Sequence, residues 1–361
     1  MYSFKQKMKL ALKTCLLSVG FLPAMAQQSY ELNQGWKCTK ANTIQASGTQ
    51  ISSPQFDLST WKPAVVPGTV LTTQLANKEI PDPFYGLNNE KIPDVYHVGK
   101  EYYTYWFVKD FEEKKPASGE KVWLKFRGIN YSCEIFVNGQ KVNKEPFEGM
   151  FLRKAFDITG LLASNGKNRL AVIVYPSDNP GNPNGGQGGD GTIAKNVAIQ
   201  YTAGWDWIRP IRDRNTGIWD KVQIEKTGLV NLKDPHVITL VSGVRTPEGT
   251  QQPTTIKTTA DLENTSDSPV SGILTFKING QTVSEKLTLP AKSSKTYKIK
   301  DLIVSNPKLW WPAGYGPQNL YDAEFSFTPN GQKFQILRNS KWVFVKFKPH
   351  GILLPKVARL P

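Results

Sequence analysis

The chain has 361 residues with 45 basic and 30 acidic side chains, which gives a formal net charge of +15. The excess lies at the two ends: residues 1–26 and 333–361 contain basic residues and no acid, whereas residues 27–332 carry a net charge of only +4. Nucleic-acid binding requires basic residues clustered on a folded domain, so a nucleic-acid-binding protein is disfavoured. The chain has 29 Gly and 25 Pro, which interrupt long helices, so a helical bundle is disfavoured as well.

The first predicted element is an export signal. Residues 1–9 are basic, Cys15–Leu22 is a short apolar run, and Ala24–Ala26 reads Ala-Met-Ala, a small-residue cleavage site before Gln27. The apolar run is far shorter than the ~20 residues needed to cross a bilayer, and no other stretch is long enough to span one. An amphipathic first helix is the alternative interpretation. The pattern predicts a signal peptide over residues 1–26 and a periplasmic or extracellular protein.

Removal of this signal would leave two cysteines, Cys38 and Cys133. Export permits a disulfide, but Cys133 lies in Tyr131–Val137, where alternate apolar residues share one face of a predicted strand. We therefore expect Cys133 to be a buried free thiol that packs as a small hydrophobic residue, with a disulfide as the alternative.

Residues 27–228 are predicted to form a β-sandwich. Apolar residues alternate with others over Val122–Phe126 and Leu170–Val174, and Asn138-Gly139 supplies the positive φ angles of a tight hairpin turn. No segment of ten or more residues follows a period of 3.6. Many short strands over about 200 residues predict an antiparallel sandwich of the jelly-roll type.

A long connection, Tyr175–Tyr201, is rich in Gly, Pro and Asn, and loops of this length are commonly functional or disordered. Trp205, Asp206 and Trp207 follow it. Two indoles beside a carboxylate suit a sugar, because aromatic rings cover the apolar face of a pyranose and the carboxylate accepts hydrogen bonds from hydroxyls. A tryptophan pair in the core, with Asp206 tied to a neighbouring arginine, is the alternative that the residues leave open.

Residues 229–331 are predicted to form a second sandwich of about 100 residues. Short alternating strands and the hairpin signal Asn279-Gly280 are typical of an immunoglobulin-like fold. Residues 332–361 differ in composition, being basic and aromatic without acid. We expect residues 333–361 to be poorly ordered because their charges repel one another, with an edge strand over Lys341–Phe347 as the alternative.

No metal or cofactor site is predicted. The three histidines, His97, His236 and His350, lie far apart, and no spacing of Cys, His or Glu is typical of zinc ligands. The step Asn89-Glu90 has the residue types of a β-glycosidase acid/base. It lies in a predicted loop between Gly86 and Pro93, so we expect Glu90 to be solvated.

Several motifs, in order along the chain, resemble glycoside hydrolase family 2. Gly204–Trp207 together with Arg212–Trp219 is similar to the branch that holds endo-β-mannosidases, β-mannosidases and exo-β-D-glucosaminidases. Leu309–Pro312 with Gly316–Tyr321 resembles the immunoglobulin-like domain of the same family. The remaining motifs lie in the first predicted sandwich: Trp61–Gly68, Ile80–Gly86, Tyr103–Phe107, Phe126–Asn130, Phe136–Gly139 and Phe156–Thr159.

The resemblance implies a galactose-binding-like jelly roll, an immunoglobulin-like sandwich and then a (β/α)₈ barrel with two catalytic glutamates of a retaining glycosidase. It also implies that Asp206 and Trp207, next to Trp205, bind the terminal sugar in the barrel pocket. A barrel needs about 250 residues, and only 29 follow Gln332. We therefore expect the barrel and both glutamates to be absent, and we name no catalytic residue. The acid-free end is typical of a shifted reading frame or a truncated gene.

The resemblance predicts the non-catalytic N-terminal part of an exported retaining β-glycosidase, inactive alone, with carbohydrate as its partner. The implied ligands are β-mannosides, N-glycans or glucosaminide oligomers. Two alternatives stay open: a stand-alone carbohydrate-binding module that uses residues 205–207, and a structural remnant without a ligand.

Overall fold

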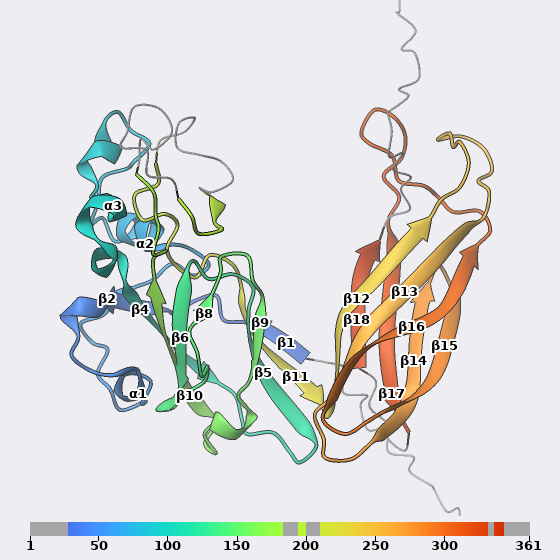
Figure 1. Cartoon of the computed structure of the whole chain (residues 1–361), viewed down its shortest axis with the longest axis horizontal. Coiled ribbons are helices and arrows are strands. Elements are labelled where there is room, and N and C mark those ends of the chain that lie inside the picture. Colours follow the sequence, from blue (N-terminus) through green and yellow to red (C-terminus); the bar gives the residue numbers. More distant parts are fainter. Residues whose placement is uncertain (1–27, 183–193, 200–209, 331–335, 343–361) are drawn as a thin grey trace, which may run out of the picture.

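The computed structural model describes residues 28–182, 194–199, 210–330 and 336–342 (Figure 1). Two sandwich units follow one another along the chain, and each contains two antiparallel sheets. The predicted all-β class, with a jelly-roll sandwich followed by an immunoglobulin-like sandwich, is confirmed. The chain passes from the first unit to the second at Leu229, between strands β11 and β12.

The first unit packs a four-stranded sheet against a seven-stranded sheet. The four-stranded sheet has the order β1-β11-β5-β9, formed by Gln28–Glu31, Val222–Gly228, Glu120–Phe126 and Lys154–Asp157. The larger sheet has the order β3-β2-β4-β10-β6-β7, with β8 also paired to β6. Its strands are Lys62–Pro63, Lys37–Lys40, Tyr105–Glu112, Lys167–Tyr175, Ser132–Val137, Gln140–Lys141 and, for β8, Phe147–Glu148.

Helices are short and lie in the connections. Among the described residues none exceeds seven residues, and none is long and apolar enough to cross a membrane. Helices α1 and α2 each begin with a capping box, in which Ser47 or Thr69 exchanges hydrogen bonds with the third helical residue. The helices are Gly48–Ile51 (α1), Val70–Ala76 (α2) and Val95–Val98 (α3). The 3₁₀ turns are Ala41–Thr43 (η1), Asn88–Lys91 (η2), Lys100–Tyr103 (η3) and Thr159–Leu161 (η4).

The core of the first unit lies between its two sheets. Val122, Leu124 and Phe126 of β5 point into it, as their alternation predicts. Cys133 is buried there and Cys38 is buried as well; both are free thiols, so the prediction of a free Cys133 is confirmed. Burial in an apolar environment raises the pKa of both thiols, which keeps them protonated at neutral pH.

Strand β10 is buried on both faces. Leu170, Val172 and Val174 enter the main core, whereas Ala171 and Ile173 pack on the other side in a cluster that also contains Ile51 of α1. This second layer explains why β10 is a continuous apolar run instead of a strict alternation of apolar and polar residues.

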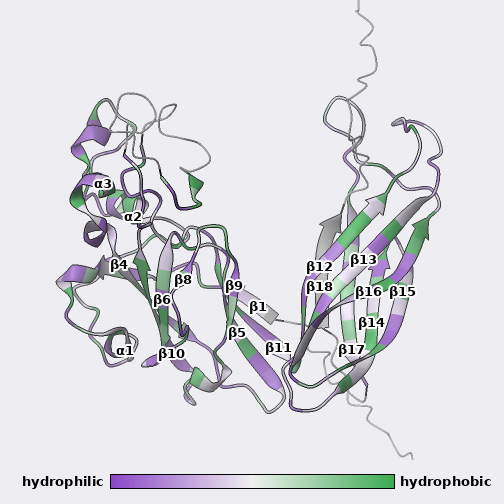
Figure 2. Cartoon of the chain, viewed as in Figure 1, coloured by the Kyte–Doolittle hydropathy of each residue, from purple (hydrophilic) through white to green (hydrophobic). Residues whose placement is uncertain are grey.

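The second unit packs sheet β12-β13-β16 on sheet β15-β14-β17-β18. Apolar and polar residues alternate along its strands (Figure 2). Phe276 and Phe325 meet in its core with ring centroids 4.7 Å apart. The strands are Val230–Leu240 (β12), Thr254–Asn264 (β13), Val270–Ile278 (β14), Gln281–Leu289 (β15), Ser293–Val304 (β16), Tyr321–Pro329 (β17) and Ile336–Trp342 (β18).

Both predicted Asn-Gly hairpin turns are present. Asn138 and Gly139 have φ angles of 49° and 83° between β6 and β7, and Asn279 and Gly280 have φ angles of 50° and 72° between β14 and β15. In both pairs the positive φ angles match the right-handed twist of the adjoining strands.

The end of the second unit differs from the prediction. Residues 333–361 were expected not to complete the sandwich, with Lys341–Phe347 as an alternative edge strand. Instead, Ile336–Trp342 forms β18, which pairs antiparallel with β17 from Tyr321↔Trp342 to Phe327↔Ile336. The prediction is wrong for these seven residues, because hydrogen bonding to β17 outweighs the charge repulsion that it relied on. The rest of the tail lies outside the described residues.

Candidate functional site

The predicted sugar-binding residues Trp205, Asp206 and Trp207 lie outside the described residues. The chain on both sides of them is described, as far as Asn182 and again from Pro210, with residues 194–199 between. The residues that fix the chain on either side of residues 205–207 therefore define the candidate site.

A buried ion pair between Asp94 and Arg214 is the centre of this region. The guanidinium binds both carboxylate oxygens, with Nη1 2.8 Å from Oδ2 and Nη2 2.9 Å from Oδ1. The two side chains are only 2% and 1% exposed. Asp94 also caps α3, because its Oδ1 accepts a hydrogen bond from the Tyr96 N–H. A bidentate, buried pair of this kind fixes the orientation of the guanidinium relative to the carboxylate as well as the distance between them.

The same guanidinium holds the chain on both sides of the predicted site. Its Nη2 and Nε donate to the carbonyl oxygens of Gly181 and Pro180, at 2.9 and 3.1 Å. Its Nη1 donates to the carbonyl oxygen of Ile211 at 2.8 Å. Arg214 therefore fixes the chain just before residue 183 and just after residue 209.

Arg212 and Asn89 attach a second loop to this point. The Arg212 Nε donates to the Asn89 carbonyl oxygen at 2.8 Å, and the Asn89 Nδ2 donates to the Pro210 carbonyl oxygen at 3.3 Å. Arg212 Nη1 also lies 3.3 Å from Asp94 Oδ2. Asn89 is buried for this reason, whereas Glu90 is exposed, as predicted from its loop position.

Asp213 ties the region to helix α2. Its Oδ2 accepts a hydrogen bond from the Leu71 N–H at 2.8 Å, and its Oδ1 accepts one from the Asn215 N–H at 2.9 Å. The side chain is completely buried, and this desolvation raises its pKa from 3.8 to about 6, although the hydrogen bonds oppose the shift.

Asn130 joins the same segment to the sandwich. Its Nδ2 donates to the Arg214 carbonyl oxygen at 2.7 Å, and its backbone exchanges hydrogen bonds with Gly217 at 2.9 and 2.8 Å. Residues 210–217 are thus held from the core on one side and from the 89–94 loop on the other.

An apolar turn stands beside this framework. Phe84, Tyr85 and Leu87 are 94%, 77% and 62% exposed. The turn is internally fixed, because the Phe84 N–H donates to Asp82 Oδ1 at 2.9 Å and Gly86 adopts a φ of 54°.

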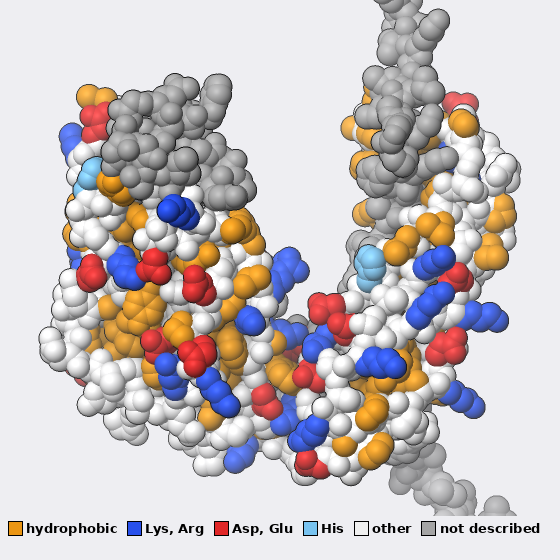
Figure 3. Space-filling model, viewed as in Figure 1, with side chains coloured by type: hydrophobic (Ala, Val, Ile, Leu, Met, Phe, Trp, Pro, Cys, Tyr) orange, Lys and Arg blue, Asp and Glu red, His pale blue; other side chains and the backbone are white. Residues whose placement is uncertain are grey.

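Elsewhere, on the face drawn in Figure 3, basic and acidic side chains are interspersed over both units.

Sequence reasoning singled out Asp206 and Trp207 by their chemistry, which stays a prediction, and it did not single out Asp94. Asp94 lies 120 residues before Arg214, and no spacing pattern connects them. The only signal was the density of charged residues over Arg212–Arg214. For metals, the part of the chain that the structure describes holds no group of three His, Cys, Asp or Glu side chains suited to an ion.

Two family models match the chain. One, described as "Glycosyl hydrolase 2 galactose-binding domain-like", covers residues 36–220, and the other, "Glycosyl hydrolases family 2", covers residues 243–339. The matches correspond to the two sandwich units.

Curated relatives extend well beyond the matched region. The chain is 42% identical over 328 residues to a mannosylglycoprotein endo-beta-mannosidase of Lilium longiflorum, which spans 87% of the chain and 34% of that protein. It is 31% identical over 284 residues to an exo-beta-D-glucosaminidase of Streptomyces avermitilis, spanning 76% and 28%. The chain therefore spans about a third of the length of these relatives.

Solved structures show the same fold. The exo-chitosanase of Amycolatopsis orientalis superposes with a TM-score of 0.73 at 24% identity, over 88% of this chain and 34% of that one. A beta-D-mannosidase from Dictyoglomus thermophilum gives a TM-score of 0.64 at 26% identity, over 88% and 36%.

Proposed function

The chain belongs to glycoside hydrolase family 2, and on this premise we propose that it is the non-catalytic, sugar-binding part of an exported retaining β-glycosidase. The proposed ligands are β-mannosides, including those of N-glycans, or β-D-glucosaminide oligomers. The observation that carries the proposal is the 42% identity, over 87% of the chain, to an endo-beta-mannosidase. The glucosaminidase relatives support the second class of ligand.

Asp206 and Trp207, with Trp205, are the proposed sugar-binding residues. Their chemistry suits the task, since an indole packs on the apolar face of a pyranose and a carboxylate accepts hydrogen bonds from hydroxyl groups. The buried Asp94–Arg214 pair supports the assignment, because it anchors residues 180–181 and Ile211 on either side. Fixed anchors reduce the number of arrangements open to a binding segment, and this lowers the entropic cost of binding.

The proposed part is inactive alone. Retaining glycosidases need two carboxyl groups about 5–5.5 Å apart, and in this family they are carried by a (β/α)₈ barrel. The described residues form sandwiches with no helix longer than seven residues, and the longest remaining stretch is residues 1–27. No part of a barrel, which needs about 250 residues, is present among the described residues.

Activity and binding assays test this proposal together. The purified chain should not hydrolyse nitrophenyl β-mannoside or nitrophenyl β-glucosaminide. Calorimetry with mannose, glucosamine and chitosan oligomers should show binding no tighter than millimolar, because a binding site that is open on one side buries little of the ligand surface. The double variant Asp206→Ala/Trp207→Ala should lose that binding. The control Asp267→Ala, whose side chain is 91% exposed in the second unit, should retain it. Hydrolysis would contradict inactivity, and equal titrations of wild type and double variant would contradict the assigned residues.

Export is the other part of the proposal, and it is supported by the basic, apolar and Ala-Met-Ala order of residues 1–26. Expressed in a bacterial host, the mature protein should be recovered outside the cytoplasm with Gln27 as its first residue. N-terminal sequencing checks this, and secreted material that begins at Met1 would contradict it. A variant with Leu16→Arg and Leu17→Arg, which interrupts the apolar run, should stay inside the cell.

A further inference from the structure

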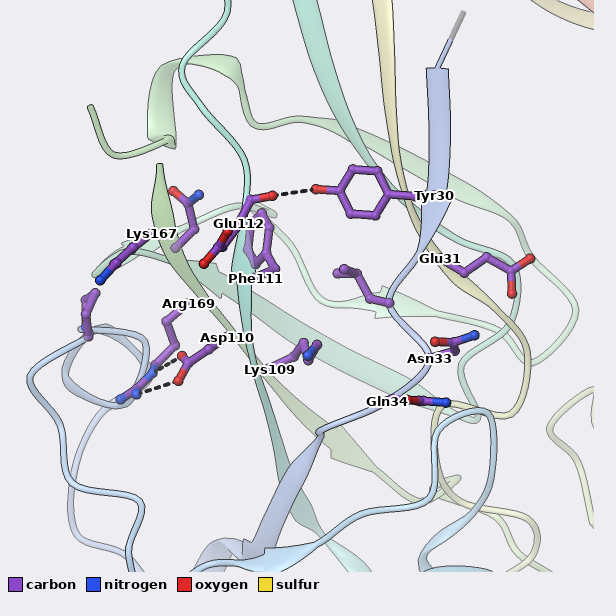
Figure 4. A pocket seen from close by; sticks show the side chains of 13 residues that line it. Tyr30, Glu31, Asn33, Gln34, Lys109, Asp110, Phe111, Glu112, Lys167 and Arg169 are labelled. Atoms are coloured by element: carbon purple, nitrogen blue, oxygen red, sulfur yellow. Dashed lines mark hydrogen bonds and ion pairs between the residues drawn. The ribbon is translucent and has the colours of Figure 1, made fainter. Parts of the chain in front are cut away.

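A cavity lies on the first unit, away from the loops just described. Its volume is about 700 Å³, within the range of small-molecule sites. Three segments and Pro54 line it; the segments are Tyr30–Gln34, Lys109–Glu112 and Lys167–Arg169 (Figure 4). Strand β10 begins at this cavity with Lys167 and reaches the long connection at Tyr175, about 26 Å away at the rise of a strand. The cavity therefore lies at the opposite end of β10 from Tyr175, where the long connection begins.

The walls of the cavity are held in place by hydrogen bonds. The Arg169 side chain is 8% exposed; its Nε and Nη2 bind the two Asp110 carboxylate oxygens at 2.6 and 3.0 Å, and its Nη1 donates to the Phe56 carbonyl oxygen at 2.6 Å. The Tyr30 hydroxyl lies 3.0 Å from the Glu112 carbonyl oxygen. Side chains fixed before binding lower the entropic cost of taking up a ligand.

Other polar groups around the cavity are unengaged. Within the described part of the chain, the side chains of Asn33, Gln34, Lys109, Glu112 and Lys167 take part in no hydrogen bond or ion pair. Figure 4 shows them on both sides of the cavity, the amides from the turn after β1 and the charged groups from β4 and β10. Unengaged donors and acceptors around a preformed hollow are available to a ligand.

The backbone adds further groups. Strand β2 pairs with β4 only as far as Lys37↔Val108, so the edge of β4 is open from Lys109 onward. The Glu112 carbonyl oxygen faces Tyr30 at that edge. Residues two apart in a strand direct their peptide groups to the same side, so the N–H and C=O of Asp110 face the cavity edge too.

The chemistry of these groups selects the ligand. Donors (ammonium, amide and peptide N–H) and acceptors (carboxylate and carbonyl) both line the cavity, and hydroxyl groups of a ligand can bind either kind because a hydroxyl both donates and accepts. The lining has three basic side chains and three acidic ones, a balance that does not attract a polyanion. The ring of Tyr30, 37% exposed, supplies an apolar surface. We infer that this cavity binds a neutral mono- or disaccharide, as a second sugar site distinct from residues 205–207.

Amide chemical shifts of the full chain, titrated with D-mannose, D-glucose or cellobiose, test the inference. The amides of Asn33, Gln34 and Lys167 should shift and saturate at millimolar sugar. The double variant Glu112→Ala/Lys167→Ala removes two unengaged side chains, so it should fold normally and bind at least tenfold more weakly. The control Lys144→Ala/Glu145→Ala removes the same residue types at exposed positions outside the cavity, and should bind as the wild type does.

Three outcomes would overturn the inference: no shift of these amides with any of the sugars, equal binding by the cavity variant, or saturation by acetate but not by a neutral sugar, which would indicate an anion site. The variant Asp206→Ala/Trp207→Ala separates this inference from the proposed function. It should abolish shifts that depend on residues 205–207 and leave those of Asn33, Gln34 and Lys167 unchanged.

Discussion

Replacing Arg214 with alanine is expected to lower the free energy of unfolding of the first unit by about 3 kcal/mol, because it removes the bidentate counter-charge of the buried Asp94 carboxylate and leaves only the longer contact with Arg212 Nη1. Asp94 is 2% exposed, so its carboxylate has little contact with bulk solvent that could compensate for the lost guanidinium. The substitution also removes the hydrogen bonds to Pro180, Gly181 and Ile211. Urea denaturation followed by tryptophan fluorescence measures the loss.

Further variants test whether the loss of stability comes from the buried, bidentate ion pair. Arg214→Lys should recover only part of the stability, since one ammonium cannot bind both carboxylate oxygens and the three carbonyl groups together. Lys62→Ala removes the Lys62–Glu79 pair, whose lysine is 59% exposed, and should cost roughly 1 kcal/mol or less. If Arg214→Ala proves no more costly than Lys62→Ala, the buried pair does not hold this end of the sandwich. Asp94→Asn, which keeps the shape of the side chain, gives a second measurement should Arg214→Ala fail to fold.

The fold was predictable where its signals are local. The alternation over Val122–Phe126 and the Asn-Gly turns at 138 and 279 are set by neighbours in sequence, and the structure contains both. Strand β10 shows the limit of such signals, because its burial on both faces depends on α1, which lies more than a hundred residues earlier. Strand β18 shows a second limit of local signals, because its position is determined by pairing with β17 and not by the composition of the tail itself.

The sequence could suggest a candidate site only where residues that are neighbours in the chain carry the chemistry. Trp205, Asp206 and Trp207 stand together in sequence, so their residue types alone suggested a sugar. The Asp94–Arg214 pair and the cavity beside Tyr30 are assembled by the fold. Lys109 and Lys167, for example, each have the sequence context of a solvated strand end, and only the pairing of β4 with β10 brings them to one cavity.

Lowering the pH is expected to strengthen the contribution of Asp213 to stability. Its pKa is about 6 in the folded chain, against an ordinary value of 3.8, because the carboxyl group is fully buried. The folded state therefore binds the proton more tightly than the unfolded state does. The resulting stabilisation is fully present below pH 3.8 and is lost as the pH rises through about 6. Its full size is about 3 kcal/mol, from a pKa difference of about two units.

The variant Asp213→Asn isolates this contribution, because it cannot titrate while other carboxyl groups titrate equally in both proteins. It should be less stable than the wild type, since its amide presents an N–H to one of the two backbone N–H donors, Leu71 and Asn215. The stability difference should shrink by about 2 kcal/mol between pH 4 and pH 7, because part of the full effect lies below pH 4. The exposed Asp57 gives the opposite sign: hydrogen bonds from Ser59 lower its pKa, so the difference between wild type and Asp57→Asn should grow as the pH rises. A difference for Asp213→Asn that stays constant with pH would show that the buried carboxyl group keeps its ordinary pKa.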